Sequence, residues 1–314
     1  MEVIEDTPLL KLNYEKNTIE EVRKELKLSR EEIVKLLDSF EEWIDKQQHF
    51  TMKKFDRHYL EMLLIFAKGS LERAKTGLDK FCTMKTLLPN FFTKCDAKNE
   101  LKDTSHCFLH GTMPKLLKDN YRLNIVKIIS SEFDASYLKD YYRSSLLIGE
   151  YVKRYDYTHG IHSIIDLNDV NVLNVMTKIN VVELRNMMSL LMEGSKFRIK
   201  AIYILSSSKT IDAFVSLLKQ TVSSKVGDRI HALKSLESLH KFVPKEYLPI
   251  DYGGDQLTMK QLNDNWVHHL STPENVAFFR QIHNARTDEK YRLTEVYNDQ
   301  VLGLPGSFRT LSVD

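Results

Sequence analysis

Arg198-Ile199-Lys200-Ala201-Ile202-Tyr203-Ile204-Leu205 is the stretch of sequence that decides the fold. Its β-branched and aromatic residues favour a strand, and the nearly continuous apolar run predicts a strand that is buried on both faces. Strands of this kind occur in parallel sheets that are covered by helices. Arg198 and Lys200 are two residues apart, so we expect both side chains to project from one face at the entrance of the strand.

An apolar helix is predicted directly after this strand. Its apolar residues recur at helical spacing and form one stripe, made of Ile211, Phe214, Val215, Leu217, Leu218 and Val222. Ser223 and Ser224 predict the start of a short second helix, in which Lys225 and Arg229 would share a face because they are four residues apart. Two basic pairs therefore flank an apolar helix, a pattern that suits a protein that holds an apolar ligand and contacts a charged surface.

The rest of the chain divides into regions of different periodicity. Residues 18–92 keep helical spacing, and Ser29 before Glu31 and Glu32 predicts a helix cap. Residues 95–112 are polar and predict an irregular linker. Strands and helices then alternate, which predicts a mainly parallel sheet with right-handed crossovers: a strand over 122–129, a helix over 135–152, a strand from Gly160, a helix over 175–192 and the strand at 198–205. A helix over 259–269 precedes a charged tail that ends in Gly306-Ser307-Phe308-Arg309.

Three motifs in this order resemble the CRAL-TRIO lipid-binding family of Sec14-like proteins. Gly160-Ile161-His162-Ser163-Ile164-Ile165-Asp166-Leu167 is similar to the glycine-led core strand of the family, and residues 239–254, from Leu239 to Gly254, are similar to its closing motif. A family module of helices precedes that domain, and it is similar to four stretches of this chain: Trp43-Ile44 and residues 56–66, 70–75 and 88–92. The resemblance covers roughly residues 20–260 and extends to the branch with the α-tocopherol transfer protein and cellular retinaldehyde-binding protein.

The resemblance implies an α/β fold in which an N-terminal all-helical module precedes a CRAL-TRIO domain with a lipid cavity and a gate helix. We expect the helical CRAL-TRIO-N module over residues 1–94, the linker over 95–112, the lipid-binding domain over 113–256, and a C-terminal helix and tail over 257–314. The implied function is membrane-to-membrane transfer of a hydrophobic small molecule, an isoprenoid-like lipid such as tocopherol or a retinoid. The alternative is a lipid-dependent sensor or scaffold that signals its ligand state to a protein partner.

The hydrophobic ligand pocket is predicted from family positions and from periodicity. The resemblance places three ligand-facing residues on the helix before Gly160, and alternation or helical spacing adds residues from two strands and the helix between them. The gate helix, residues 210–222, completes the wall. The predicted residues are Tyr142, Ser145, Gly149, Ile161, Ser163, Ile165, Met187, Leu191, Ile202, Ile204, Phe214, Leu218 and Val222. Ser145, Ser163 and Tyr203 are the candidates for a polar contact with the ligand. A packed core without a cavity fits the same residues.

The resemblance also implies that Arg198, Lys200, Lys225 and Arg229 hold a phosphoinositide headgroup, since clustered bases suit phosphate recognition. The alternative for these four residues is an ordinary solvated surface. Two departures from the family pattern concern the gate: Lys196 stands where relatives have proline, and Lys219-Gln220-Thr221 replaces Lys-Pro-Phe. Gln220 has the backbone N–H that proline lacks, so we expect a straighter gate helix.

Composition narrows the classes of function. The 314 residues carry a formal net charge of +2, so we expect no nucleic acid partner. Cys82, Cys95 and Cys107 indicate reduced thiols, because the count is odd and no two are close. The first six residues are acidic, and no apolar run reaches the roughly 18 residues of a membrane span. We therefore expect a soluble, cytoplasmic monomer that binds membranes peripherally and transiently.

The sequence lacks the motifs of several enzyme classes. Neither Gly-x-Gly-x-x-Gly, Gly-x-x-x-x-Gly-Lys-Ser/Thr nor Gly-x-Ser-x-Gly occurs. His106, Cys107 and His110 form one short cluster without the second ligand pair of a structural zinc site. We therefore expect no metal, no cofactor and no enzymatic activity, but a bound hydrophobic ligand.

Overall fold

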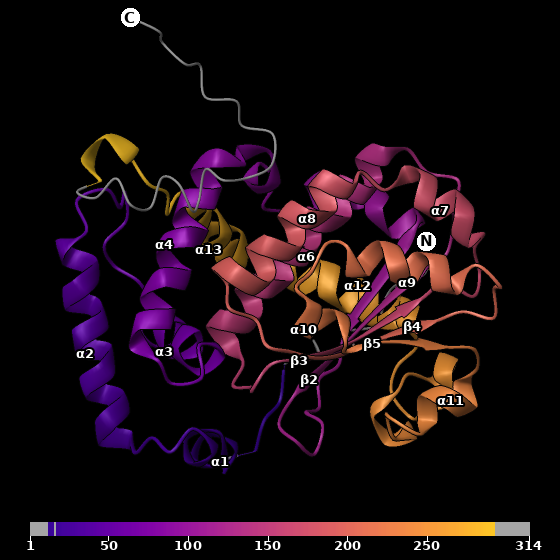
Figure 1. Ribbon diagram of the computed structural model, residues 1–314, viewed down its shortest axis with the longest axis horizontal. Helices are drawn as coiled ribbons and strands as arrows, with labels where there is room; N and C mark the ends of the chain where they lie inside the picture. The colour runs from indigo at the N-terminus through magenta and orange to yellow at the C-terminus, as the bar shows by residue number, and fades with distance from the viewer. Residues whose placement is uncertain (1–11, 16, 293–314) are drawn as a thin grey trace, which may run out of the picture.

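The computed structural model describes residues 12–15 and 17–292 of the chain, and its N-terminal region is helical (Figure 1). This region contains α1 (Thr18–Glu25), α2 (Arg30–Lys46), α3 (Arg57–Phe66), α4 (Leu71–Leu87) and the short η1 (Pro89–Phe92). Ser29 caps α2 as predicted, because its side chain accepts a hydrogen bond from the Glu32 N–H while the Glu32 carboxylate accepts one from the Ser29 N–H. The buried residues Ile33, Phe40 and Ile44 hold α2 against α3 and α4.

The expectation of an irregular linker over residues 95–112 is wrong. This stretch contains α5 (Ala97–Glu100), η2 (Lys102–His106) and β1 (Phe108–Thr112), which pairs with β2. The polar residues that suggested a linker belong to the two short helices. Cys107, Phe108 and Leu109 that follow are buried, and they make the edge strand part of the domain core.

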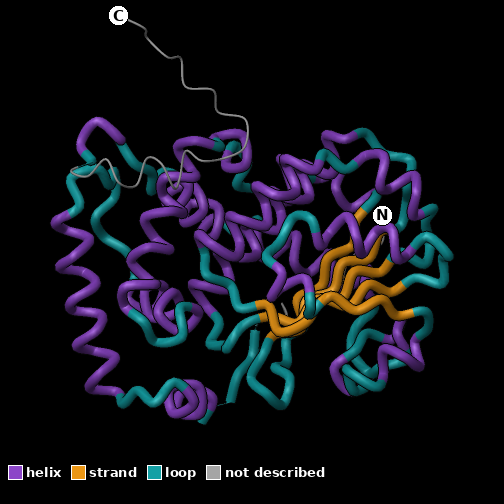
Figure 2. The backbone as a smooth tube through the Cα atoms, viewed as in Figure 1, coloured by secondary structure: helices purple, strands orange, loops and turns teal. Residues whose placement is uncertain are grey.

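The sheet has five strands in the order β1-β2-β3-β4-β5 (Figure 2). The other strands are β2 (Arg122–Ile128), β3 (Ile161–Asp166), β4 (Ile199–Leu205) and β5 (Ile230–Leu233). β1 is antiparallel to β2, and the four strands from β2 to β5 are parallel. The mainly parallel sheet that the alternating pattern predicts is therefore confirmed.

Helices connect the parallel strands. α6 (Ala135–Tyr155) joins β2 to β3, whereas α7 (Val172–Lys178), α8 (Val181–Ser189) and the single π turn η3 (Leu190–Gly194) join β3 to β4. α9 (Ile211–Lys219) and α10 (Ser224–Gly227) lead to β5. The one helix predicted over 175–192 is thus interrupted: Asn180 caps α8, because its side-chain oxygen accepts from the N–H groups of Val182 and Glu183 at 3.0 and 3.2 Å.

The C-terminal part covers the face of the sheet that lies opposite α6, α8 and α9, and it then returns to the helical region. α11 (Leu236–His240), η4 (Lys245–Tyr247), η5 (Ile250–Tyr252) and α12 (Met259–Leu270) pack on the sheet. α13 (Pro273–His283), which the sequence did not predict, and η6 (Glu289–Tyr291) follow. Lys85 of α4 donates to the Ile282 carbonyl at 2.6 Å, so α13 is fixed beside α4 (Figure 1). The acidic start of the chain and the predicted tail motif at Gly306–Arg309 lie outside the described residues.

Side chains of the sheet alternate between two cores. Ile164, Tyr203 and Leu205 face α11 and α12, whereas Ile202 and Ile204 face α6, α8 and α9. The register shifts once, because Ile161 stands opposite Ile199 but His162 stands opposite Ala201. Lys200 is the extra residue of this bulge. No helix among the described residues is long and apolar enough to cross a membrane.

Candidate functional site: an apolar chamber beside a basic cavity

An apolar chamber of about 190 Å³ lies between the sheet and the helices α6, α8 and α9. Most of the pocket residues predicted from the sequence line it: Tyr142, Ser145, Gly149, Ile161, Ser163, Ile165, Met187, Leu191, Ile202, Leu218 and Val222. Those on β3 are alternate residues, as a strand with one face toward the chamber requires. The face of the sheet that borders the chamber is thus the one on which the sequence pattern placed the ligand wall.

Ile204 and Phe214 do not line the chamber. Ile204 lies two residues further along β4 than Ile202 and is fully buried in the hydrophobic core that surrounds α7 and α9. Phe214 belongs to the same core and is only 3% exposed. Both residues support the wall rather than forming its surface.

The gate helix is shorter than predicted. α9 ends at Lys219, although the Gln220 N–H still bonds to the Ser216 carbonyl at 3.3 Å. The helix therefore does not continue through residue 222 as expected, and Thr221 and Val222 lie in the turn that follows. The buried residues Ile211, Phe214 and Leu218 recur at intervals of three and four, so α9 presents one apolar face to the interior.

Two of the three polar residues predicted for the chamber, Ser145 and Ser163, line it, and Tyr203 does not. Ser145 donates to the Tyr141 carbonyl at 3.0 Å, and Tyr203 belongs to the opposite face, where its hydroxyl lies 3.4 Å from His162 Nδ1. Ser163 lines the chamber as predicted. Five polar residues that the sequence analysis did not assign to the site also line it, namely His110, Thr112, Arg122, Asn124 and Thr221. The first four come from β1 and β2, and β1 was mistaken for part of a linker.

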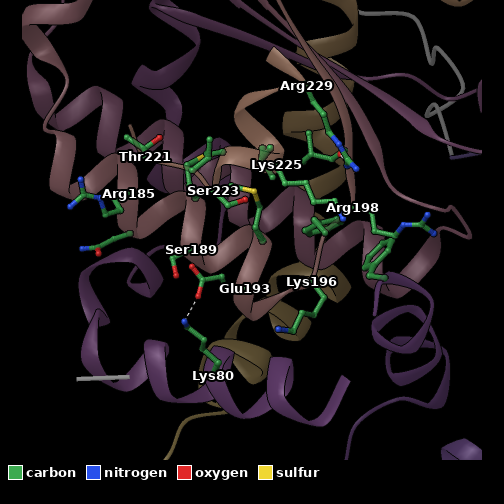
Figure 3. A pocket seen from close by; sticks show the side chains of 18 of the residues that line it. Lys80, Arg185, Ser189, Glu193, Lys196, Arg198, Thr221, Ser223, Lys225 and Arg229 are labelled. Atoms are coloured by element: carbon green, nitrogen blue, oxygen red, sulfur yellow. Dashed lines mark hydrogen bonds and ion pairs between the residues drawn. The ribbon is translucent and has the colours of Figure 1, made fainter. Parts of the chain in front are cut away.

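A larger cavity of about 790 Å³ lies next to the chamber (Figure 3). Arg198, Lys200, Lys225 and Arg229, the four predicted headgroup ligands, all line it. Ser223 precedes the predicted short helix, α10, which ends at Gly227, so Arg229 approaches from the connection to β5 instead of sharing a helical face with Lys225. Five further bases that the sequence analysis missed complete the lining: Lys68, Arg73, Lys80, Arg185 and Lys196.

Like charges crowd this cavity. Arg198 and Lys200 lie over the Tyr121 ring, with centroid distances of 5.7 Å for Cζ and 5.2 Å for Nζ. The Nη1 atom of Arg198 is buried and has no hydrogen-bond partner among the described residues. Burial lowers the pKa of Lys68, and the positive charges of Lys225 and Arg198 lower it further. An anion that occupied the cavity would relieve this repulsion.

One acidic residue, Glu193, lines the basic cavity, and it pairs with Lys80 (Figure 3). Lys196 is half-buried, and the pKa of its ammonium group is lowered, first by burial and then by the charge of Lys80. Arg229 donates to the Ile199 carbonyl, which fixes its guanidinium group at the start of β4. The bases therefore come from the turn after α3, from α4 and α8, from β4 and the segment that leads into it, and from α10 and the connection to β5, and only the tertiary fold brings them together.

The chamber and the basic cavity share a wall. Met188, Phe197, Ile199, Thr221 and Val222 line both. Ile199 faces both spaces because the bulge at Lys200 gives it the same orientation as Ile202. The residues that follow the gate helix thus separate an apolar space from a positively charged one.

Two models of known protein families match parts of this chain. A family model of the CRAL/TRIO domain matches residues 108–254, from β1 to the end of η5, and a model of the Pinta-like UBA domain matches residues 29–101. The solved structure of Sfh5 is similar at 12% sequence identity with a TM-score of 0.47, over 86% of this chain and 98% of that chain. No curated protein sequence matches the chain.

None of the three matches singles out the tocopherol-transfer and retinaldehyde-binding branch that the sequence motifs resemble. The domain model begins at β1, which agrees with the sheet that contains Phe108–Thr112. Residues 29–101 therefore form a UBA-like helical region, and residues 108–254 form an α/β CRAL/TRIO domain with a five-stranded, mostly parallel sheet.

Proposed function

We propose that this protein binds one isoprenoid-like hydrophobic molecule and transfers it between membranes at the cytoplasmic surface. The shared wall between the apolar chamber and the basic cavity is the observation that supports this proposal most strongly. An apolar lining with few polar groups suits a hydrophobic ligand. A positively charged space beside it suits an anionic membrane surface.

The gate is the turn that follows α9, together with the inner face of that helix. Leu218 and Val222 line the chamber, and Val222 also lines the basic cavity. A chamber of about 190 Å³ is smaller than the roughly 300–1,000 Å³ of typical ligand sites. A long ligand therefore requires these two side chains to move outward. Such movement exposes apolar surface, which contact with a bilayer stabilises.

The basic cavity is proposed to recognise a phosphoinositide headgroup. Its bases come from separate elements, so they can contact a polyphosphate from several directions. Charge-assisted hydrogen bonds to phosphate are stronger than bonds between neutral groups, and an arginine can donate two of them in parallel. Arg198 has a buried Nη1 that a phosphate oxygen would satisfy.

We propose that the protein makes and breaks no covalent bonds. Burial raises the pKa of the Cys82 and Cys95 thiols to about 11, so both thiols are protonated at neutral pH and are poor nucleophiles. The Cys95 Sγ lies 3.3 Å from His283 Nδ1, but burial lowers the pKa of His283 to about 4, and an ion pair between the two is therefore unfavourable. We therefore assign the contact between Cys95 and His283 a role in packing and no role in catalysis.

Transfer of retinol from donor to acceptor vesicles tests the proposal, with fluorescence as the measurement. Leu173 of α7 is 50% exposed beside the gate helix, whereas Ile250 of η5 is 60% exposed on the far side of the sheet. We expect transfer by the natural protein to exceed spontaneous exchange and Leu173→Asp to slow it several-fold, because a charge opposes contact with hydrocarbon. Ile250→Asp is the matched control and should transfer normally. A rate equal to spontaneous exchange would contradict the carrier function and favour a lipid-dependent sensor.

A further inference from the structure

His110 on β1 is a buried polar residue that the proposed gate and basic cavity do not use. Its side chain lines the apolar chamber, and the residue is 6% exposed. The His110 N–H of the backbone donates to Asn263 Oδ1 of α12 at 3.1 Å, and this bond holds the edge strand in place. The bond to α12 therefore holds His110 in place on the wall of the chamber.

The hydrogen bonds around the ring determine its tautomer. Thr112 Oγ1 donates to Asn124 Oδ1 at 2.9 Å, so the hydroxyl proton of Thr112 is already used. His110 Nε2 lies 3.1 Å from the same hydroxyl oxygen, which leaves Nε2–H as the donor and Thr112 as the acceptor. Burial lowers the pKa of His110 to about 3, so the ring is neutral at physiological pH. In this tautomer Nδ1 carries a lone pair and no proton.

The Nδ1 atom is buried and has no hydrogen-bond partner within residues 12–15 and 17–292. A buried acceptor without a partner is unfavourable, and one donor hydrogen bond from a ligand would remove this cost. Two neighbouring polar side chains are already bonded within the protein. Arg122 binds Asp156 through Nε at 2.8 Å, and Ser145 binds the Tyr141 carbonyl.

We propose that His110 Nδ1 accepts a hydrogen bond from the hydroxyl group of an apolar ligand and thereby selects alcohols over molecules that lack a donor. This inference rests on the proposed binding of a hydrophobic molecule and names its chemical class, an isoprenoid-like alcohol or phenol. An aldehyde, an ester or a hydrocarbon has no proton to offer to Nδ1. Ser163, which lies next to Asn124 in the register of β2 and β3, belongs to the same polar part of the wall.

The place of His110 in the sheet also orients the ligand. β1 and β5 form opposite edges of the sheet, with His110 on one and Ile230, which also lines the chamber, on the other. Residues 218–222 follow β4 and lead to β5, so the gate lies toward the β5 edge. A ligand that enters past Val222 therefore places its hydroxyl group at the far end of the chamber and its hydrocarbon chain toward the gate.

Binding of geranylgeraniol and of its aldehyde, geranylgeranial, to the full chain tests this inference, because the pair differs in the donor but hardly in size. We expect the natural protein to bind the alcohol about tenfold more tightly, as one buried hydrogen bond predicts. His110→Phe keeps a ring of similar shape and should bind the two compounds equally. His162→Phe is the matched control, because His162 is equally buried at 8% exposure but faces the opposite side of the sheet, and it should keep the preference.

The outcomes separate the two proposals. Equal binding of alcohol and aldehyde by the natural protein, or a preference that survives in His110→Phe, would overturn the role of His110 and leave the carrier function intact. A preference for the aldehyde would overturn the assigned tautomer and with it the inference. If the natural protein bound neither compound, both this inference and the proposed carrier function would fail. Thermal unfolding of each variant shows whether a loss reflects the site or the fold.

Discussion

Lys153 of α6 donates a hydrogen bond of 2.8 Å to the Tyr59 hydroxyl of α3, so a buried ammonium group joins the CRAL/TRIO domain to the helical region. The same Nζ lies 2.9 Å from Glu150 Oε1, and Tyr59 donates to Glu150 Oε2 at 2.9 Å. Lys153 is fully buried and Glu150 is 1% exposed. Burial lowers the pKa of Lys153 to about 8, while the charge of Glu150 opposes that shift.

Lys153→Met should destabilise the protein by about 3–5 kcal/mol, because it leaves the Glu150 carboxylate buried without its partner. Denaturant unfolding at neutral pH measures the loss. Glu150→Gln/Lys153→Met is the control: it removes both charges and should recover much of the stability. A loss below about 1 kcal/mol for the single variant would show that the pair does not join the two parts of the chain.

Ser163→Leu should reduce the amount of bound isoprenoid without unfolding the protein, because its side chain lines the chamber and the added bulk fills empty space. Gly149→Phe should behave differently. A Cβ atom at Gly149 would lie only 3.1 Å from Phe197 Cε2, so this variant overpacks the wall and should lose roughly 1–3 kcal/mol of stability. Ligand extraction with mass spectrometry, together with thermal unfolding, measures both effects. If Ser163→Leu destabilised the fold but left the amount of bound ligand unchanged, Ser163 would not border empty space.

Stability should fall as the pH falls from 7 to 5. The folded-state pKa of His110, about 3, lies below the roughly 6.5 of an unfolded histidine, so the unfolded chain takes up the proton first. Protonation of a histidine of this kind in the unfolded chain therefore lowers the free energy of unfolding by about 2 kcal/mol between pH 7 and pH 5. His283, with a pKa of about 4, acts in the same direction. Denaturant unfolding of His110→Phe should show a correspondingly weaker pH dependence. An unchanged pH dependence would show that folding does not lower the pKa of His110.

Much of the fold follows from local pattern. The apolar run of Ile199–Leu205 and the alternation in Ile161–Asp166 predict adjacent buried strands, and both form the centre of the sheet. Periodicity also predicts which face of β3 lines the chamber. The depth of the chamber does not follow from it, because Ile204 repeats the pattern of Ile202 beyond the end of the empty space. Periodicity assigns a residue to one face of the sheet, but it does not show how far along the strand the empty space extends.

Two other features depend on tertiary structure. β1 has only five residues, including His110, Gly111 and Thr112, and it becomes a strand because β2 pairs with it and α12 covers its other face. The basic cavity draws Lys68, Arg73 and Lys80 from the helical region, more than 100 residues before the predicted bases. No spacing rule along the chain connects those side chains, so the size of the basic cavity could not be predicted.

We propose that the basic cavity binds a phosphorylated headgroup while the apolar chamber holds its ligand. Lys200 and Lys225 are exposed and line the cavity, so Lys200→Glu/Lys225→Glu reverses two charges with little effect on packing. Lys241→Glu/Lys245→Glu makes the same change in charge at exposed residues close to α11 and is the matched control.

The decisive measurement is cosedimentation with phosphatidylinositol bisphosphate vesicles and with phosphatidylserine vesicles of equal charge, at a salt concentration where the Debye length is about 8 Å. We expect the natural protein and the control to bind the phosphoinositide vesicles about tenfold more strongly. Lys200→Glu/Lys225→Glu should lose that difference yet take up isoprenoid from detergent normally. Equal binding of the natural protein to both kinds of vesicle would contradict the account and reduce the cavity to an ordinary basic surface.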